Sequence, residues 1–392
     1  MDMKWTYPRV YRVLSPEHQE ALQKREVLLI DRNVAEEVLT PEACLEVLDG
    51  AFREEGLGAA VNRTKTNIHV PGEDPNASYR YCSMEGGIRG MNVVAIRIKS
   101  DMSTPRWVHG EEREDWYCVY PGRFMGLILL FSAQDGALLA VLQDAHIQHM
   151  RVAATDALAA RCMAKEDASV LGLVGSGGMA WTHAFFYTMI RPIRRIKVYS
   201  PNPEHRQRFA VQLADQLGIE VAAINSAEEA VRGSDMVVGC TNSLRPVIRG
   251  EWLEKGMHLT LMKIQELDEA GYRRLDRHVL YVSPPGVQGS PCDNLLTIPY
   301  DGEFLRRFCG GSHPEMWQQE LTWTGQEKIF RLPDVLLGKV KGRDHNHQIT
   351  CFRSEGTGVQ FAAVALKVYE EAKRRGLGRS LPLEWFLQDV TN

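Results

Sequence analysis

The sequence contains no apolar run long enough to cross a membrane. Its longest apolar stretches, residues 126–131 and 170–174, have the length of a β-strand, whereas a membrane-spanning helix needs roughly 20 apolar residues. The first residues, which include Pro8, Pro16 and Glu17, lack the apolar core and small-residue cleavage site of a secretory signal. We therefore expect no membrane association and a cytoplasmic protein.

An excess of one charge is also lacking. The 392 residues carry a formal net charge of −4, and like charges form no long block. Proteins that bind nucleic acid usually present a strongly basic patch or domain. This composition excludes nucleic acid as a partner and leaves small molecules as the expected ligands.

Paired cysteines are absent as well. The eight cysteines are scattered without a Cys-x-x-Cys pair, which argues against a zinc site and against a disulfide framework. His345 and His347 suggest a metal enzyme as an alternative, but two ligands do not complete a site. We expect no metal and mostly buried, reduced thiols.

The length predicts two domains, because one hydrophobic core rarely grows to this size. β-type runs occur between residues 67 and 131, and Gln134-Asp135-Gly136 joins two of them in a predicted hairpin. Residues 104–124 are rich in aromatic and charged side chains without a clear period. We expect a long loop there, either a lid whose acids select a basic or aromatic substrate or a dimer contact.

Strand and helix patterns alternate from residue 169 to residue 282, which predicts a parallel, doubly wound sheet. Its first unit contains a Gly-x-Gly-x-x-Ala motif formed by Gly175, Gly177 and Ala180, with an apolar strand before it and a helix after it. This context is typical of a dinucleotide site, in which the pyrophosphate lies on the amides of the helix N-terminus. A tight turn without a nucleotide is the alternative. The residues expected to contact the cofactor here are Gly175, Ser176, Gly177, Gly178 and Met179.

The end of the second strand indicates which cofactor is bound. An acidic residue usually holds the adenosine ribose at this position, but the sequence has Ser200, followed by Asn202. Because no carboxylate is present to repel a 2′-phosphate, we favour NADP(H) over NAD(H), with His205 or Arg206 as the charge partner. Ser200 and Asn202 also suit a simple cap of the next helix.

Small polar residues follow the fourth strand, where ligands bind in open α/β sheets. Thr241 and Asn242 are expected to flank the nicotinamide ribose. A plain turn is the alternative.

Five segments occur in one order along the chain: FSAQDGALLAVLQDAHIQHMRVAATDALAA (131–160), VLGLVGSGGMA (170–180), VYSPNPEHRQRFA (198–210), MVVGCTNSLRPVI (236–248) and ITCFRSEGTGVQFAAVALKVYEEAKRRGLG (349–378). Together they resemble the ornithine cyclodeaminase and mu-crystallin family. The resemblance implies a homodimer that acts on small amino acids or their imines by hydride transfer at the alpha carbon. It also implies an α/β fold in which a doubly wound Rossmann domain (151–339) is inserted in an α+β substrate-binding and dimerisation domain (1–150 plus 340–392).

The resemblance also assigns roles to single residues. Arg63 and Arg151 match the arginines that hold the substrate carboxylate, a task that suits a guanidinium. The family's active-site lysine falls at Asn92, so Lys99 or Arg97, which share one face of a predicted strand, are expected to replace it. A solvated strand face is the alternative for both residues.

Two further departures concern the standard substrate. The cyclodeaminase aspartate is missing from residues 261–267, where Lys263 is a candidate acid or base or a plain surface lysine, and Phe361 stands where the family has an aspartate. We therefore expect an NAD(P)-dependent imine reductase or amino acid dehydrogenase, not an ornithine-cyclising enzyme. The alternatives are a non-catalytic NADPH and small-ligand binding protein of the mu-crystallin type and a cyclodeaminase with a rearranged active site.

Overall fold

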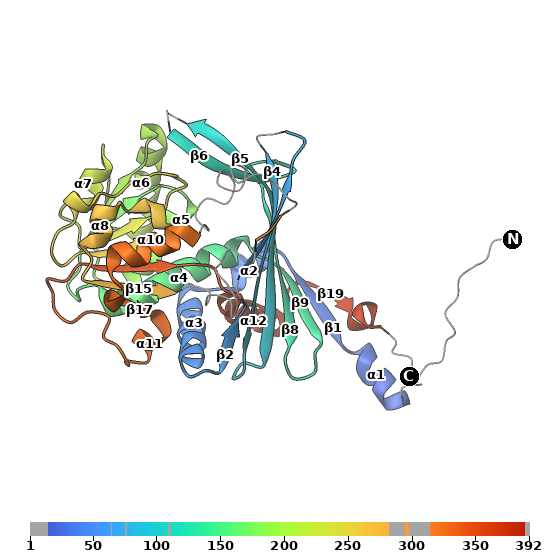
Figure 1. Ribbon diagram of the computed structural model, residues 1–392. Coiled ribbons are helices and arrows are strands. Elements are labelled where there is room, and N and C mark those ends of the chain that lie inside the picture. Colours follow the sequence, from blue (N-terminus) through green and yellow to red (C-terminus); the bar gives the residue numbers. More distant parts are fainter. Residues whose placement is uncertain are drawn as a thin grey trace.

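A computed structural model describes residues 15–63, 65–74, 77–108, 111–281, 295–297 and 314–388. Two sheets dominate this part of the chain, with helices between them and around the first sheet (Figure 1).

The first sheet is entirely parallel and carries the glycine motif. Its order is β12 (Glu220–Ala223), β11 (Arg195–Tyr199), β10 (Val170–Val174), β13 (Met236–Gly239), β14 (His258–Leu261), β18 (Thr350–Ser354), β15 (Arg277–Tyr281) and β17 (Ile329–Arg331). The crossover helices include α5 (Gly178–Ile190), α6 (Pro203–Leu217), α7 (Ala227–Val231) and α8 (Glu269–Arg273). The predicted doubly wound parallel sheet is confirmed.

One strand of this sheet comes from the C-terminal part of the chain. β18 lies beyond residue 340, in the segment expected to belong to the other domain, yet it pairs with β14 and β15. All five residues of β18 are buried. Because both faces of such a central strand are covered, its residues form a continuous buried run, and its place in the sheet cannot be read from its own pattern.

The second sheet is mixed. Its main order is β16 (Leu295–Thr297), β3 (Thr66–Pro71), β4 (Ser78–Ile88), β5 (Val93–Val108), β8 (Met125–Ser132), β9 (Leu138–Gln143), β1 (Glu26–Ile30) and β19 (Arg379–Pro382). Three short additions complete it: β2 (Ala60–Asn62) on β4, β6 (Glu111–Cys118) on β5, and β7 (Tyr120–Pro121) on β6. The predicted hairpin is the β8–β9 pair, whose turn includes Gly136 with a positive φ of 78°.

Helices cover one face of the second sheet. α12 (Gly358–Arg375) packs on β4 and β5, and α3 (Pro41–Gly56) packs against α12 and α4 (Ala145–Met163). The other α-helices of the described residues are α1 (Pro16–Gln23), α2 (Arg32–Val38), α10 (Pro314–Thr324) and α11 (Leu332–Leu336). No described helix covers the opposite face of β4, β5 and β8 (Figure 1).

The expected long loop at 104–124 is wrong. β5 and β6 form an antiparallel hairpin that continues the second sheet, with Met102 opposite Tyr117 and Val108 opposite Glu111. In Figure 1 this hairpin reaches from the sheet toward the parallel sheet. Its strands project beyond the helices, so their side chains lack the apolar alternation that a strand packed on a core shows.

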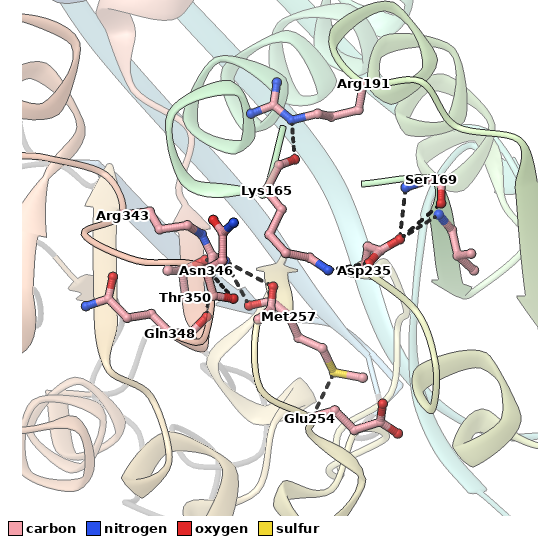
Figure 2. A network of polar contacts seen from close by, with 12 residues as sticks. Lys165, Ser169, Arg191, Asp235, Glu254, Met257, Arg343, Asn346, Gln348 and Thr350 are labelled. Atoms are coloured by element: carbon pink, nitrogen blue, oxygen red, sulfur yellow. Dashed lines mark hydrogen bonds and ion pairs between the residues drawn. The ribbon is translucent and has the colours of Figure 1, made fainter. Parts of the chain in front are cut away.

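A polar network fixes the segment that connects α4 to β10 (Figure 2). Arg191 donates from Nε to the carbonyl of Lys165 at 2.7 Å, and Lys165 Nζ donates to Asp235 at 2.7 Å. Asp235 also accepts from the backbone N of Ser169 at 2.9 Å. These bonds set the direction in which the chain enters the parallel sheet, and therefore the position of α4 beside it.

Candidate active site

Gly175 makes the turn at the end of β10. Its φ is +124°, and a Cβ there would lie 2.4 Å from the backbone oxygen of Cys240. Only glycine combines this backbone conformation with so close an approach. The motif therefore places the neighbouring strand end directly beside the turn.

Gly177 is the N-cap residue of α5, and no side chain caps this helix. A Cβ at Gly177 would meet no atom within 4 Å, so the space in front of the helix N-terminus is open. The first amides of a helix point outward without intrahelical partners and carry partial positive charge. The open cradle fits the pyrophosphate of a dinucleotide.

A cavity of about 670 Å³ extends from this cradle along the ends of β10, β11 and β13. It contains nine of the ten residues predicted for the cofactor: Gly175, Ser176, Gly177, Gly178, Met179, Ser200, Asn202, Thr241 and Asn242. Glu204, His205 and Arg208 line its far end. The tenth predicted residue, Arg206, is not among the lining residues.

Arg206 instead holds the loop after β11. Its guanidinium donates to the carbonyl of Ser200 at 3.0 Å and to Asn225 Oδ1 at 2.9 Å. Asn202 accepts from the backbone N of His205 at 2.9 Å, so it caps α6 and lines the cavity at once. Sequence reasoning missed Arg208, which lies one helical turn after Glu204 and hence on the same face of α6.

The hydroxyl of Ser176 connects the glycine turn to this loop. It donates to Ser200 Oγ at 2.8 Å and lies 2.8 Å from His205 Nδ1. Three polar side chains from three successive elements therefore meet where a ribose would lie.

A second cavity, of about 450 Å³, adjoins the first. His149, Met179, Cys240 and Thr241 line both cavities. The second cavity is closed on its other side by the second sheet. A ligand in one cavity therefore comes within contact range of a ligand in the other at these four residues.

The second sheet contributes cationic side chains through strand alternation. Met84 is opposite Arg97 and Cys82 is opposite Lys99 in the antiparallel β4–β5 pair, and all four residues line the cavity. Residues two apart on a strand share a face, which also brings Arg80 to the cavity. The expectation that Arg97 and Lys99 share one face is thus met.

Arg97 and Arg151 lie on Phe361, and we call these three residues the Phe361 cluster. The guanidinium carbons are 5.4 Å and 4.9 Å from the centre of the ring. Arg151 also donates to Gln148 Oε1 at 2.8 Å and to Gln360 Oε1 at 3.0 Å. Burial, reinforced by the nearby Arg97, lowers the pKa of Arg151 to about 9. A bound anion would offset both effects.

Lys99, Arg80 and Lys263 surround Trp116, and we call these four residues the Trp116 cluster. The distances to the ring centre are 4.3 Å from Lys99 Nζ, 4.9 Å from the Arg80 guanidinium carbon and 5.5 Å from Lys263 Nζ. Asp101 lies behind them, paired with Lys99 and, at 3.3 Å, with Arg80. Burial, followed by repulsion from Arg80, lowers the pKa of Lys99 to about 8.

Lys263 comes from the parallel sheet, two residues after β14 ends. The neighbouring Glu266 is fully buried, and its oxygens accept from the backbone N of Thr241 at 2.7 Å and of Met262 at 2.8 Å. Burial raises the pKa of Glu266. Sequence reasoning named Lys263 but missed Glu266, which orders the loops on both sides of the cavity.

Two residues carried over from the family lie elsewhere. Arg63 does not line the cavity: its side chain is 67% exposed and lies 3.6 Å from Glu85. Asn92 has a positive φ of 51° just before β5 begins and is likewise absent from the cavity lining. The positions on β5 that do enter the cavity are those of Arg97 and Lys99.

The comparisons with known proteins agree with this geometry. Residues 24–376 match the sequence model of the ornithine cyclodeaminase/mu-crystallin family. The chain belongs to this family.

Individual relatives cover most of the chain. Alanine dehydrogenase of Archaeoglobus fulgidus is 25% identical over 364 residues, which is 91% of this chain and 98% of the relative. Δ1-pyrroline-2-carboxylate reductase of Bacillus cereus is 25% identical over 261 residues, 65% of this chain and 74% of the relative. The solved Δ1-pyrroline-2-carboxylate reductase of Thermococcus litoralis, in complex with NADH and L-proline, has a TM-score of 0.70 at 25% identity and covers 91% of this chain and 100% of its own.

The described ranges lack two further features. They contain no helix with both the length and the apolarity needed to cross a membrane. They also contain no group of three or more His, Cys, Asp or Glu side chains arranged to hold a metal ion. The rings of His345 and His347 are 6.4 Å apart.

Proposed function

We propose that the chain is an NAD(P)-dependent oxidoreductase that interconverts a small amino acid and its imine. The observation that carries this proposal is the shared rim of the two cavities at His149, Met179, Cys240 and Thr241. A dinucleotide whose pyrophosphate lies at Gly177 would extend along the first cavity to this rim. When bound, it supplies or accepts the hydride.

Arg151 is proposed to bind the substrate carboxylate. It is 4% exposed and lines the second cavity, and its neighbours Gln148 and Gln360 fix the guanidinium by hydrogen bonds. Arg97 adds positive charge beside it while paired with Asp144. A fixed guanidinium holds a carboxylate in one orientation, which positions the alpha carbon.

Lys99 is proposed to exchange a proton with the substrate nitrogen. With a pKa of about 8 it is largely protonated at neutral pH and still able to give up its proton. Lys263, whose Nζ is 5.5 Å from the centre of the same ring, is the second candidate for this role. In the reducing direction the lysine keeps the imine protonated, so that the alpha carbon accepts hydride.

NADP(H) is proposed as the preferred cofactor. Ser200 presents a hydroxyl where an acid would repel a 2′-phosphate, and Arg208 lines the same end of the cavity. Glu204 lines it too and opposes this preference. Arg208→Gln separates the effects: it should weaken NADPH binding and leave NADH binding nearly unchanged in a thermal-shift titration. Equal weakening of both cofactors would contradict the assignment.

The protein is proposed to form a homodimer through the uncovered face of the second sheet. Its outward side chains include Ile96 and Ile98 on β5 opposite Leu129 and Leu127 on β8. Val94 at the end of the same row is 37% exposed. A contiguous apolar face of this kind usually marks an interface. Ile96→Glu should shift the protein from dimer to monomer in light scattering coupled to gel filtration.

The proposed activity is tested by cofactor absorbance with a panel of amino acids, cyclic imines and 2-oxo acids plus ammonia. Turnover of at least one class supports the oxidoreductase. Stabilisation by NADPH without turnover of any class would favour the alternative, a binding protein without catalysis.

A further inference from the structure

Asp156 and His183 form a fully buried pair beside the two cavities. Asp156 lies on α4 and His183 lies on α5. His183 Nε2 is 2.8 Å from Asp156 Oδ2. The other carboxylate oxygen, Oδ1, accepts a hydrogen bond from Ser354 Oγ at 2.8 Å. One carboxylate thus joins α4 to α5 and to the end of β18.

This network connects the substrate cavity to the cofactor rim. Ser354 is the last residue of β18 and lines the second cavity. At the opposite end, His183 Nδ1 is 2.7 Å from the backbone oxygen of Met179, which lines both cavities. Asp156 lies one helical turn after Val152, a lining residue on the same face of α4. A buried carboxylate therefore stands behind the wall of the second cavity and reaches it through the hydroxyl of Ser354.

The hydrogen-bond pattern fixes the direction in which the Ser354 hydroxyl donates. A backbone carbonyl only accepts, so His183 Nδ1 carries a hydrogen and Nε2 faces the carboxylate. The proton between Nε2 and Asp156 Oδ2 resides on one of these two atoms, and in both cases Oδ1 remains an acceptor. Ser354 therefore donates its only hydrogen to Asp156. What it offers a ligand in the cavity is the lone pairs of its oxygen.

Ser354 lies close to the proposed carboxylate site. Two residues later, a Cβ at Gly356 would lie 3.2 Å from Nη2 of Arg151. Two residues of chain span at most about 7 Å, so Ser354 and the Arg151 guanidinium border the same part of the second cavity. An amino acid carries its carboxylate and its nitrogen on one carbon. A carboxylate at Arg151 therefore places the nitrogen among the immediate neighbours of that arginine.

We infer that Ser354 binds the substrate nitrogen, its oxygen accepting an N–H of the ammonium or protonated imine while Asp156 holds its hydroxyl hydrogen. This inference rests on the proposed function and adds a residue that recognises the amino group. A carboxylate does not suit the position, because it has no hydrogen to donate and the hydroxyl has none left to offer. Asp156 and His183 are positioning residues that act through Ser354. In the reducing direction the bond favours the protonated imine, the form that accepts hydride.

Binding of matched acids tests the inference without requiring turnover. L-Alanine is compared with propionate, and L-proline with cyclopentanecarboxylate, by calorimetry on the NADPH complex, in which neither amino acid is oxidised. The wild type should bind at least one amino acid roughly tenfold more tightly than its nitrogen-free partner, because hydrogen bonds from charged donors are strong. Ser354→Ala should remove most of this preference. A wild type without the preference, or a Ser354→Ala variant that keeps it, would overturn the inference.

Variants of Asp156 test the positioning role. Asp156→Asn keeps an oxygen for the Ser354 hydroxyl and donates to His183 Nε2, so the preference should stay close to that of the wild type. Asp156→Ala frees the hydroxyl to turn into the cavity and should lower the preference as Ser354→Ala does. Arg151→Gln is the matched comparison, because it should weaken amino acid and nitrogen-free acid alike. An Asp156→Ala variant that folds and keeps the full preference would contradict the positioning role.

Turnover and cofactor affinity separate the remaining possibilities. Ser354→Ala should lower kcat/KM for the best substrate of the panel by roughly tenfold and leave the affinity for NADPH unchanged. An amino acid preferred in binding but not turned over would refute the proposed activity and leave the nitrogen site standing. Turnover that Ser354→Ala does not change would do the reverse. Weaker NADPH binding with an unchanged preference would show that Ser354 accepts from the nicotinamide carboxamide, and would overturn the inference.

Discussion

Arg97 and Asp144 form an ion pair of 2.6 Å between β5 and the start of α4. Their side chains are only 4% and 1% exposed. The carboxylate fits closely, because a Cβ at Gly126 on the adjacent strand would lie 2.0 Å from Asp144 Oδ1. The pair joins the second sheet to the helix that carries Arg151, so it supports both the fold and the position of the proposed carboxylate site.

Removing one partner of this pair should cost much stability. We expect Asp144→Asn to lower the free energy of unfolding by about 3–5 kcal/mol, because it leaves a buried guanidinium without its counter-charge. Urea denaturation followed by circular dichroism measures this change. The double variant Arg97→Met with Asp144→Leu should recover most of the loss, since it removes both charges. A single variant as stable as the wild type would show that solvent reaches the pair.

Substitution by alanine should destabilise the protein at Gly175 but not at Gly177. Gly175→Ala should lower the free energy of unfolding by about 2 kcal/mol or more, because it combines a positive φ with a clash against the Cys240 backbone. Gly177→Ala places its methyl group in open space and should leave the melting temperature of the cofactor-free protein unchanged.

For Gly177 the expected effect of the substitution is on the affinity for the cofactor. Gly177→Ala should weaken NADPH binding by roughly tenfold or more, the equivalent of about one lost charge-assisted hydrogen bond to the pyrophosphate. Calorimetry on the purified variant checks this value. Unchanged affinity would mean that the pyrophosphate does not lie on this helix N-terminus.

The nucleotide cradle was predictable because its determinants are local. A strand, a turn that needs glycine and a helix lie within about twenty consecutive residues, and each leaves a mark in the sequence. The second cavity was less predictable. Arg80 faces it only because β4 pairs with β5 in a particular register, and the register is not visible in either strand alone.

The β5–β6 hairpin and β18 were missed for related reasons. The hairpin extends past the helices, so its charged and aromatic residues show no core pattern. β18 pairs along both edges with strands of the parallel sheet, β14 and β15, which end far before it in the sequence, at Leu261 and Tyr281, and all five of its residues are buried. Phe361 departs from the family's aspartate, and only the packing reveals that it supports Arg97 and Arg151.

Substitution of Arg151 or Arg63 by glutamine tests which of the two arginines binds the substrate. Arg151→Gln should lower kcat/KM by roughly 10- to 100-fold, since it removes a charge-assisted pair worth about 1.5–3 kcal/mol. Arg63→Gln should stay within about twofold of the wild type, because an exposed ion pair contributes little. Steady-state kinetics on the best substrate of the panel compares the two. An Arg63 variant impaired as much as the Arg151 variant would restore the role that the family resemblance assigned to Arg63.

The pKa of Lys99 predicts the pH dependence of the reaction. Its value of about 8 lies below the usual value for lysine because of burial and the nearby Arg80. Reduction of the imine needs the protonated amine, so kcat/KM should be level below pH 8 and fall by about tenfold per pH unit above it. Oxidation of the amino acid needs the neutral amine and should rise through the same pH range.

Lys99→Arg provides the control for this profile. A guanidinium keeps its proton throughout the range, so the reductive rate should be lower at every pH and its fall near pH 8 should disappear, while the positive charge over Trp116 remains. Lys263→Arg should retain the inflection, because Lys99 is unchanged in that variant. If the inflection instead persists in Lys99→Arg and vanishes in Lys263→Arg, the proton is exchanged by Lys263, the residue that the parallel sheet brings to the same ring.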